Sequence, residues 1–324
     1  MPLNTVARKW SSTMQITDRT YTLTELRPFI NWAYFFHAWQ MPTRYASLGH
    51  LHQCKACRTQ WLAEQGAQNH AQASEAMKLM DDALAILPII DTKATIKARV
   101  GLFEANSTDD DIWVAHHGQK TRIPCLRQQQ VTDNGFQLCL ADYIRPAHMG
   151  IPDRIGIFAT TVDYAPEAEY PNDPYNQMLA QTLCDRLAEA AACLLHLEVR
   201  KSIWAYAPDE DLSIADLLLE RNQGIRPAVG YPSLPDQSIN FLLTSIIQAD
   251  SLNITLTENG AMLPHASTCG LIISHPEAHY FIVGRIDQTQ FLDYTNRRGL
   301  SADRMRKFLA ACYDNETTHN DITT

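Results

Sequence analysis

The loop at residues 226–232, Arg-Pro-Ala-Val-Gly-Tyr-Pro, combines residue types from which a binding loop can be built. Its two prolines fix φ and remove two backbone donors, while Gly230 permits conformations that other residues avoid. Arg226 offers a guanidinium suited to a carboxylate. Ala228 and Gly230 leave backbone polar groups accessible to a flat ligand, and Tyr231 adds an aromatic ring. The loop fits either a ligand-binding segment or an ordinary rigid turn.

Two acidic residues form a second candidate site. Asp185 and Glu189 stand four positions apart, so they are neighbours on one face of a helix that we expect over residues 174–201. Like charges at this spacing are mildly unfavourable unless solvent or a partner compensates them. The pair therefore fits either a solvated helix face or a polar site on a buried helix.

A third candidate is the segment 50–57, His-Leu-His-Gln-Cys-Lys-Ala-Cys. Its Cys-x-x-Cys motif, with two histidines just before it, could hold zinc or cycle as a redox pair. Structural zinc sites usually separate their ligand pairs by about a dozen residues or more, whereas all four residues here fall within eight positions. We therefore predict no metal site and expect a partly exposed loop beside a helix.

Charge balance and glycine spacing exclude several classes of protein. The 324-residue chain has 27 Lys and Arg against 36 Asp and Glu, and its net charge of −9 disfavours nucleic acid as a partner. No two of its 13 glycines stand at the spacing that glycine-rich phosphate loops of dinucleotide-binding or P-loop proteins require. No run approaches about 18 uninterrupted apolar residues, so we expect no membrane partner.

The cysteines indicate a reducing compartment. Most of the eight lie in apolar segments such as 138–140 and 192–194, where a thiol behaves as a small hydrophobic group. The first 15 residues show no apolar stretch typical of a signal peptide. We therefore expect a cytoplasmic protein without a disulfide framework.

Periodicity and turn residues predict the elements that must position these candidates. Thr22 and Glu25 form a capping box that should open a short helix, and the aromatic-rich segment 29–39 should pack in the core. Further helices are expected at 58–87, where the pattern ends at a proline, and at 174–201, 213–221, 236–249 and 302–312. Strands are expected at 94–103, 111–115, 121–126, 136–144 and 154–162, as a meander, and at 253–257, 268–274 and 280–285. Because helices and strands come in blocks, the predicted class is α+β, an antiparallel sheet with flanking helices.

The loop 226–232 resembles the Arg-x-x-x-Gly-Tyr-Pro signature of the S-adenosylmethionine-binding activation module of cobalamin-dependent methionine synthase. Other segments are similar to that family in the same order along the chain. They are 26–32, 100–106, 139–142, 185–190, 199–201, 204–208 and 274–276. The resemblance covers about 21–312 and is weakest at 40–70, and it too implies an α+β fold.

The resemblance implies roles for individual residues. Arg226 would pair with the methionyl carboxylate of S-adenosylmethionine, while Ala228, Gly230 and Tyr231 would line its adenosine and methionyl groups. The remaining positions implied in the ligand pocket are Glu189, Glu220, Tyr280 and Phe281. Asp185 corresponds to an acid that receives the histidine of the cobalamin domain once that residue leaves cobalt.

Two pocket positions depart from the family pattern. Asn31 stands where the family has an aspartate that binds the ligand's amino group, and Phe281 replaces a tyrosine. A charged hydrogen bond contributes about 1.5–3 kcal/mol and a neutral one about 0.5–1.5 kcal/mol, so Asn31 implies weaker binding.

The implied function is reactivation of methionine synthase in methionine biosynthesis by reductive methylation of cob(II)alamin. The sequence contains no cobalamin-binding motif, so the chain is expected to act in trans as a methyltransferase component with little or no activity alone. Its expected cofactors are S-adenosylmethionine and a cobalamin carried by the partner. The expected partners are a methionine synthase core or another corrinoid protein and a flavodoxin-like reductase.

A non-catalytic S-adenosylmethionine sensor, or a chaperone for a corrinoid protein, is the alternative function. In either case residues 1–20 would form an N-terminal extension, 21–313 the binding domain and 314–324 a flexible tail.

Overall fold

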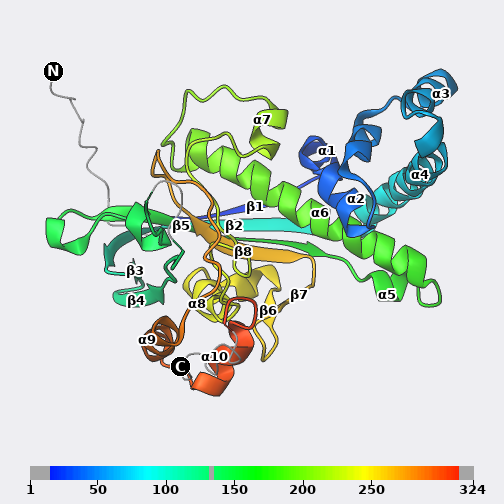
Figure 1. Ribbon diagram of the computed structural model, residues 1–324. Coiled ribbons are helices and arrows are strands. Elements are labelled where there is room, and N and C mark those ends of the chain that lie inside the picture. The colour runs from blue at the N-terminus through cyan, green and yellow to red at the C-terminus, as the bar shows by residue number, and fades with distance from the viewer. Residues whose placement is uncertain (1–14, 131–134, 314–324) are drawn as a thin grey trace.

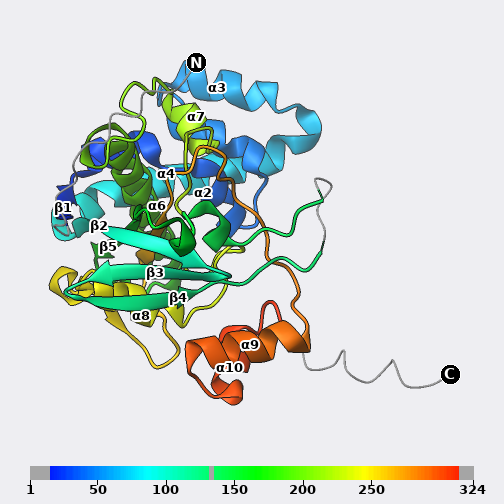
Figure 2. The ribbon, with the colours of Figure 1, turned by 90° about the vertical axis from the view of Figure 1, so that its left-hand side faces the viewer.

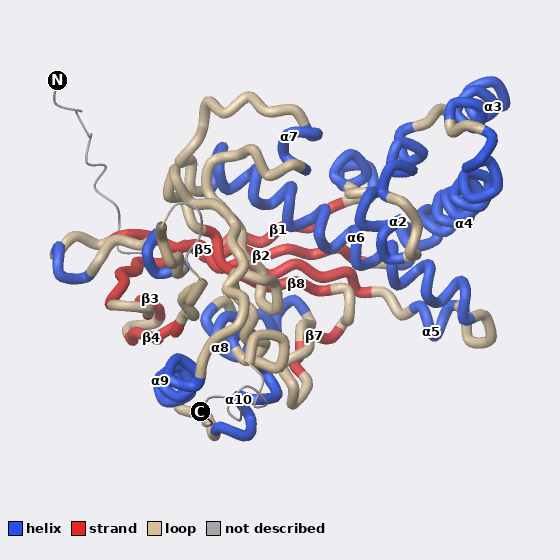
Figure 3. Tube along the Cα trace, viewed as in Figure 1, coloured by secondary structure: helices blue, strands red, loops and turns tan. Residues whose placement is uncertain are grey.

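A computed structural model describes residues 15–130 and 135–313, and these form one central antiparallel sheet with helices on both faces (Figures 1 and 3). The predicted tail 314–324 and most of the predicted extension 1–20 lie outside the described residues, so the domain limits stay a prediction. Six strands make up the described sheet: β1 (Gln15–Tyr21), β2 (Thr95–Thr108), β3 (Asp111–His116), β4 (Gln119–Pro124), β5 (Asp153–Asp163) and β8 (Ser267–Ile272).

The long strand β2 organises the sheet. One edge of β2 pairs with β5 along its length, and the other edge pairs first with β1 and then with β3, so the order is β4-β3-β2-β5-β8 with β1 also on β2. Strands β2, β3 and β4 are connected as the expected meander. Strand β5 instead returns to the opposite edge of β2, which the local turn signals did not indicate.

Helices cover the two faces of the sheet as separate layers (Figures 1 and 2). Side chains alternate along β2, so Val100 lies in the core of one face and Phe103 in the core of the other. The first layer contains α1 (Leu23–Leu26), α2 (Trp32–Ala38), α3 (Lys55–Glu64), α4 (His70–Lys93), α5 (Pro166–Glu169), α6 (Pro174–Glu198) and α7 (Ile214–Leu218). The second contains α8 (Ile239–Ile246), α9 (Gln288–Arg298) and α10 (Ala302–Phe308), beside the small ribbon β6 (Thr255–Leu256) and β7 (Met262–Leu263).

Helix α6 connects the first helical layer to the loop 226–232, because Glu189 of α6 accepts a hydrogen bond from Tyr231. Asp173 caps its N-terminus by accepting the Asn176 N–H at 3.1 Å, and Pro174 occupies its first turn. Small residues such as Ala191 are fully buried on its inner face, and Thr160 of β5 donates its hydroxyl to the Ala188 carbonyl at 2.9 Å. This close contact fixes where the outer side chains of α6, including Glu189, stand relative to the sheet.

Two predicted strands, 136–144 and 280–285, do not form. Segment 136–144 is not a strand but contains a 3-10 turn, Leu140–Tyr143, in which Asp142 accepts the Cys139 N–H at 2.9 Å. Segment 280–285 is a loop, in which Val283 donates its N–H to the Pro232 carbonyl, the Ile282 carbonyl accepts from the Gln128 amide, and Gly284 turns the chain at φ +74.

Other boundaries differ because of single residues. Gly66, at φ +77, separates α3 from α4 within the helix predicted at 58–87, and α4 continues through Pro88 to Lys93 because its inner face stays buried on both sides of the proline. The strand predicted at 253–257 shrinks to Thr255–Leu256 after Asn253, which is left-handed at φ +66. Helix α9 was not predicted.

Candidate functional site

The first half of the loop 226–232 pairs with β8 through backbone hydrogen bonds, like an additional edge strand of the sheet. Ile225 donates its N–H to the Ile273 carbonyl at 2.9 Å, Val229 donates to Cys269 at 2.9 Å, and Leu271 donates to Pro227 at 3.0 Å. A Cβ at Gly270 would stand 2.3 Å from the Pro227 carbonyl oxygen, so only glycine allows this approach. The pairing leaves the Ala228 N–H without a bond to any residue in the described part of the chain.

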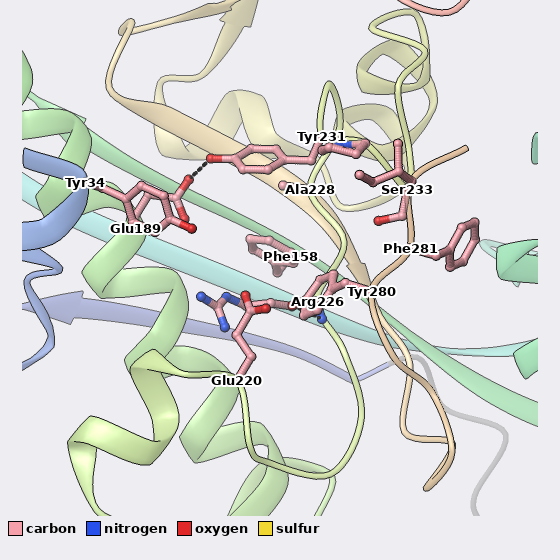
Figure 4. A pocket seen from close by; sticks show the side chains of 12 residues that line it. Tyr34, Phe158, Glu189, Glu220, Arg226, Ala228, Tyr231, Ser233, Tyr280 and Phe281 are labelled. Atoms are coloured by element: carbon pink, nitrogen blue, oxygen red, sulfur yellow. Dashed lines mark hydrogen bonds between the residues drawn. The ribbon is translucent and has the colours of Figure 1, made fainter. Parts of the chain in front are cut away.

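The second half of the loop is a tight turn. Gly230 has φ +88 and donates its N–H to the Leu234 carbonyl at 2.8 Å, and a Cβ there would meet the Gln237 amide nitrogen at 2.5 Å. This turn projects Tyr231 across the front of α6, where its hydroxyl donates to Glu189 Oε1 at 2.5 Å (Figure 4). The loop and α6 therefore form two walls of one cleft.

The cleft consists of two adjoining cavities of about 260 and 340 Å³. The residues that line both are Tyr34, Glu189, Glu220, Arg226 and Tyr231. The first cavity extends toward Phe158, Ala228, Pro232, Ser233, Tyr280, Phe281 and Ile282, and the second toward Phe29, Asn31, Arg186, Cys193, Leu217, Leu218 and Leu219. A cleft with an apolar floor and a few convergent polar groups is typical of a small-molecule site.

Arg226 lies where the two cavities meet. Its backbone N–H donates to the Tyr280 hydroxyl at 2.9 Å, which fixes the start of the loop. Its guanidinium makes no hydrogen bond or ion pair with another described residue, and Figure 4 shows it directed toward Glu220. A half-buried guanidinium without a partner is suited to receive an anionic group from a ligand.

Two carboxylates give the same cleft a negative side. Burial raises the pKa of Glu220, the positive charge of Arg226 opposes that rise, and the negative charge of Glu189 adds to it. Burial also raises the pKa of Tyr280 to about 12, so its phenol stays protonated at neutral pH. The cleft therefore combines one guanidinium, Arg226, with two carboxylates, Glu189 and Glu220, a charge pattern suited to a zwitterionic ligand.

The structure brings most of the predicted pocket residues together, with three differences. Asn31 lines the second cavity, but its Oδ1 caps α2 by accepting Ala33 N at 3.1 Å and Tyr34 N at 3.4 Å. Phe281 is buried, and its ring belongs to the core of the second face and points away from Arg226 in Figure 4. Gly230 shapes the turn without lining either cavity. Its contact with a ligand stays a prediction.

Asp185 lies outside both cavities. It accepts a hydrogen bond from the Gln181 amide at 2.8 Å, one turn earlier on α6. Burial raises the pKa of its carboxyl, while that hydrogen bond and the charge of Arg186 act in the opposite direction. The side chain is thus a half-buried acid beside the cleft, and its predicted role toward a partner stays untested.

Sequence reasoning missed Tyr34 and Arg186. Tyr34 belongs to the aromatic segment expected in the core, yet it is 61% exposed and lies at the cleft beneath the Arg186 guanidinium, 5.9 Å from its ring centre. Helical spacing was the available signal, because Trp32, Phe35 and Phe36 share the buried face of α2 and Tyr34 falls on the other.

The fold and cleft define an α+β domain with a preformed pocket between a braced loop and a long helix. A sequence model of the family described as vitamin B12 dependent methionine synthase, activation domain, matches residues 22–299. A solved crystal structure of the MetH reactivation domain bound to AdoHcy is 32% identical, with a TM-score of 0.78, and the match covers 92% of this chain and 90% of that one. The chain belongs to the family of vitamin B12-dependent methionine synthase activation domains.

Two further observations bear on the surroundings of the protein. Among the residues that the structure describes, no helix is long and apolar enough to span a membrane. All eight cysteines carry free thiols, and six of them are buried.

Proposed function

We propose that the cleft binds S-adenosylmethionine and presents it to a corrinoid carried by a separate protein, supporting reductive methylation in methionine synthase. The observation that carries the proposal is the Arg226 guanidinium, which lies at the junction of two cavities without an ion pair among the described residues. Leaving a guanidinium unpaired in a half-buried site is costly unless a ligand supplies the counter-charge.

The charge pattern of the cleft fits this ligand. Arg226 would hold the methionyl carboxylate, and Glu189 and Glu220 would lie beside the ammonium and the positive sulfur. The free N–H of Ala228 and the rings of Tyr231 and Tyr280 would receive the adenosine. An analogous ligand, AdoHcy, is bound in the related MetH reactivation domain, which supports this assignment.

The contribution of this chain to the chemistry is positioning. Bound S-adenosylmethionine supplies a methyl group activated by its positive sulfur, and a corrinoid on the partner supplies the metal that accepts it. The protein residues need only orient the ligand and exclude water, because methyl transfer requires no general acid or base. This agrees with a cleft whose acids face a cation and whose tyrosines stay protonated.

Action in trans requires a transient complex. The partner would be a methionine synthase core or another corrinoid protein, with Asp185 receiving its displaced histidine. Electrons would come from a flavodoxin-like reductase, and a net charge of −9 would slow that encounter if the reductase is also acidic. A cytoplasmic location belongs to the same proposal and is supported by the free cysteines.

Reconstitution tests this function. The chain is mixed with a methionine synthase core that lacks an activation module and carries cob(II)alamin, together with S-adenosylmethionine and a reduced flavodoxin. We expect methylcobalamin absorbance to appear only when all components are present. Arg226→Ala should abolish it, whereas Arg221→Ala, which removes an exposed arginine that pairs with Asp216 and lines neither cavity, should not. Absence of methylcobalamin despite measured ligand binding would contradict the proposal.

The second candidate function is a non-catalytic S-adenosylmethionine sensor or a chaperone for a corrinoid protein. The hydrogen bonding of Asn31 favours it. Because the Oδ1 of Asn31 already accepts two backbone N–H groups, it has no oxygen left for the ammonium of a ligand. Calorimetric titration with S-adenosylmethionine and S-adenosylhomocysteine separates the candidates in part. Failure to bind either ligand would leave only a chaperone role.

A further inference from the structure

The cysteine pair at the start of α3 stands apart from the other six cysteines. Cys54 and Cys57 are half-buried, whereas the remaining six are buried. In Figure 1 α3, whose N-cap is Cys54, packs on α4 at the opposite end of the first helical layer from α7, and neither cysteine lines the cleft. Its chemistry is therefore independent of the proposed ligand site.

The backbone of the first helical turn holds the two sulfurs together. Cys54 is the N-cap of α3, and its Sγ accepts the Cys57 N–H at 3.3 Å. The Cys54 N–H in turn donates to His52 Nδ1 at 3.3 Å. The two sulfurs and a ring nitrogen of His52 all lie within 4.8 Å of one another.

Two contacts fix this turn to the rest of the protein. Arg58, next to Cys57, makes a two-point ion pair with Asp81 of α4 and also binds the Gln53 side chain at 2.9 Å. Trp61, one turn further on, is buried and donates to Ser47 at 3.0 Å. The cysteine pair is thus presented by a rigid helix start at the protein surface.

We infer that Cys54 and Cys57 form a thiol–disulfide exchange site that reacts with low-molecular-weight disulfides. Cys54 is the attacking residue and Cys57 the resolving residue, because the Cys54 sulfur lies at the helix N-terminus, accepts the Cys57 N–H and has the Cys57 sulfur and a His52 ring nitrogen within 4.8 Å. The Cys57 amide and thiol, followed by His52, lower the pKa of Cys54 to about 6, so its thiolate predominates at neutral pH. The thiolate raises the pKa of Cys57, which keeps its proton until the second step.

The reaction balances with a disulfide as the oxidant. The Cys54 thiolate attacks one sulfur of the disulfide, its S–S bond breaks, and a mixed disulfide forms while one thiolate leaves. Cys57 then loses its proton to solvent and attacks the Cys54 sulfur, which releases the second thiolate and closes the Cys54–Cys57 bond. The protein loses two electrons and the small disulfide gains them, giving two thiols after protonation.

Oxidation of the full-length chain with glutathione disulfide tests the inference. After alkylation and peptide mass analysis, we expect a Cys54–Cys57 disulfide in the wild type and in the control Ala56→Ser. Cys57→Ser should stop at a mixed disulfide on Cys54, and Cys54→Ser should form neither product. Cys125 and Cys139 provide an internal control, because these neighbouring buried thiols should remain reduced.

The pH dependence of alkylation identifies the attacking thiol. In Cys57→Ser, which keeps the N–H of residue 57 but lacks the thiol that also lowers the Cys54 pKa, we expect the rate at Cys54 to reach half its maximum below the usual pH of about 8.5, and His52→Ala should move this midpoint upward. A midpoint near 8.5 in Cys57→Ser would overturn the assignment. So would survival of both thiols under glutathione disulfide, or one zinc per chain that protects them from it.

Discussion

Two arginines on opposite faces of the sheet have opposite kinds of surroundings. The side chain of Arg298, on α9, is 6% exposed and is held by several polar contacts. It pairs with Asp236 at 3.2 Å and donates to the Ser238 hydroxyl at 2.8 Å and carbonyl at 3.1 Å. Asp236 also accepts the Tyr294 hydroxyl at 2.8 Å. Arg226, on the α6 face, makes no such pair within the described chain. The paired cluster stabilises the fold, whereas the unpaired arginine is available to a ligand.

The largest effect on stability should come from the cluster formed by Arg298, Asp236, Ser238 and Tyr294. Asp236→Ala leaves the Arg298 guanidinium buried without a counter-charge, and we expect the free energy of unfolding to fall by about 3–5 kcal/mol in urea titrations. Ligand affinity of the folded protein should be unchanged. Asp293→Ala is the matched control, because Asp293 is exposed and Arg297 keeps its ion pair with Asp111 at 2.6 Å, so we expect a loss of only about 0.2–1 kcal/mol. If both variants lost the same free energy of unfolding, the Arg298 cluster would not be a stabilising cluster, and the contrast between Arg298 and Arg226 would fail.

The second effect concerns Arg226 and should appear in binding, not in stability. Arg226→Ala would remove the charge-assisted hydrogen bonds that we propose to the ligand carboxylate, so we expect affinity for S-adenosylmethionine to fall roughly 100-fold. Arg226→Lys should recover part of this loss, because it keeps the charge without the planar fork. A large drop in thermal stability with unchanged affinity would show that Arg226 is structural, like Arg298.

Restoring a charge at residue 31 should have a smaller effect of opposite sign. Asn31→Asp keeps the helix cap and adds a second, charged oxygen for the ligand's ammonium, so we expect affinity to rise about five- to tenfold. Asn31→Ser keeps the cap without the charge and should give no gain. Calorimetry on the two variants decides the point, and equal affinities would show that Asn31 does not face the amino group.

The smallest effect is a pH dependence carried by Glu220. Burial raises its pKa, so at low pH the carboxyl is neutral in the folded protein and offers no charge to a cationic ligand. Affinity should therefore rise a few-fold as pH increases through a range above the ordinary glutamate pKa of about 4.5, where Glu220 ionises, with proton release on binding. In the absence of ligand the same raised pKa favours the folded state at low pH, and this stabilisation is lost as pH rises through the folded pKa. Glu220→Gln should flatten both profiles, and persistence of the affinity change in this variant would assign it to another group.

The parts of the fold that the sequence predicted depend on short-range signals. The capping box of Thr22 and Glu25, the helical periodicity of 174–201 and the strand-type composition of 94–103 and 154–162 are all local, and the structure confirms the elements they mark. The loop 226–232 could be singled out because its prolines and Gly230 restrict the backbone regardless of the rest of the chain.

The remainder depends on contacts between distant residues. Segment 280–285 has the apolar composition of a strand, but Phe281 and Val283 pack on the core of the second face from a loop. The hydroxyl of Tyr280 accepts the Arg226 N–H, a contact between residues 54 positions apart. The position of Tyr34 at the cleft follows from how α2 docks on α6, which no periodicity specifies. The residue type of Asn31 also did not reveal that its side-chain oxygen accepts two backbone N–H groups of α2.

Comparing two ligands that differ only in their carboxylate tests the role of Arg226 most directly. S-adenosylmethionine and its decarboxylated form are titrated calorimetrically into the wild type and into Arg226→Ala, with unfolding followed in parallel. We expect the wild type to prefer S-adenosylmethionine by roughly 100-fold and the variant to bind both ligands about equally. A preference that survives in Arg226→Ala, or equal binding of the two ligands by the wild type, would contradict the assignment of Arg226 to the methionyl carboxylate.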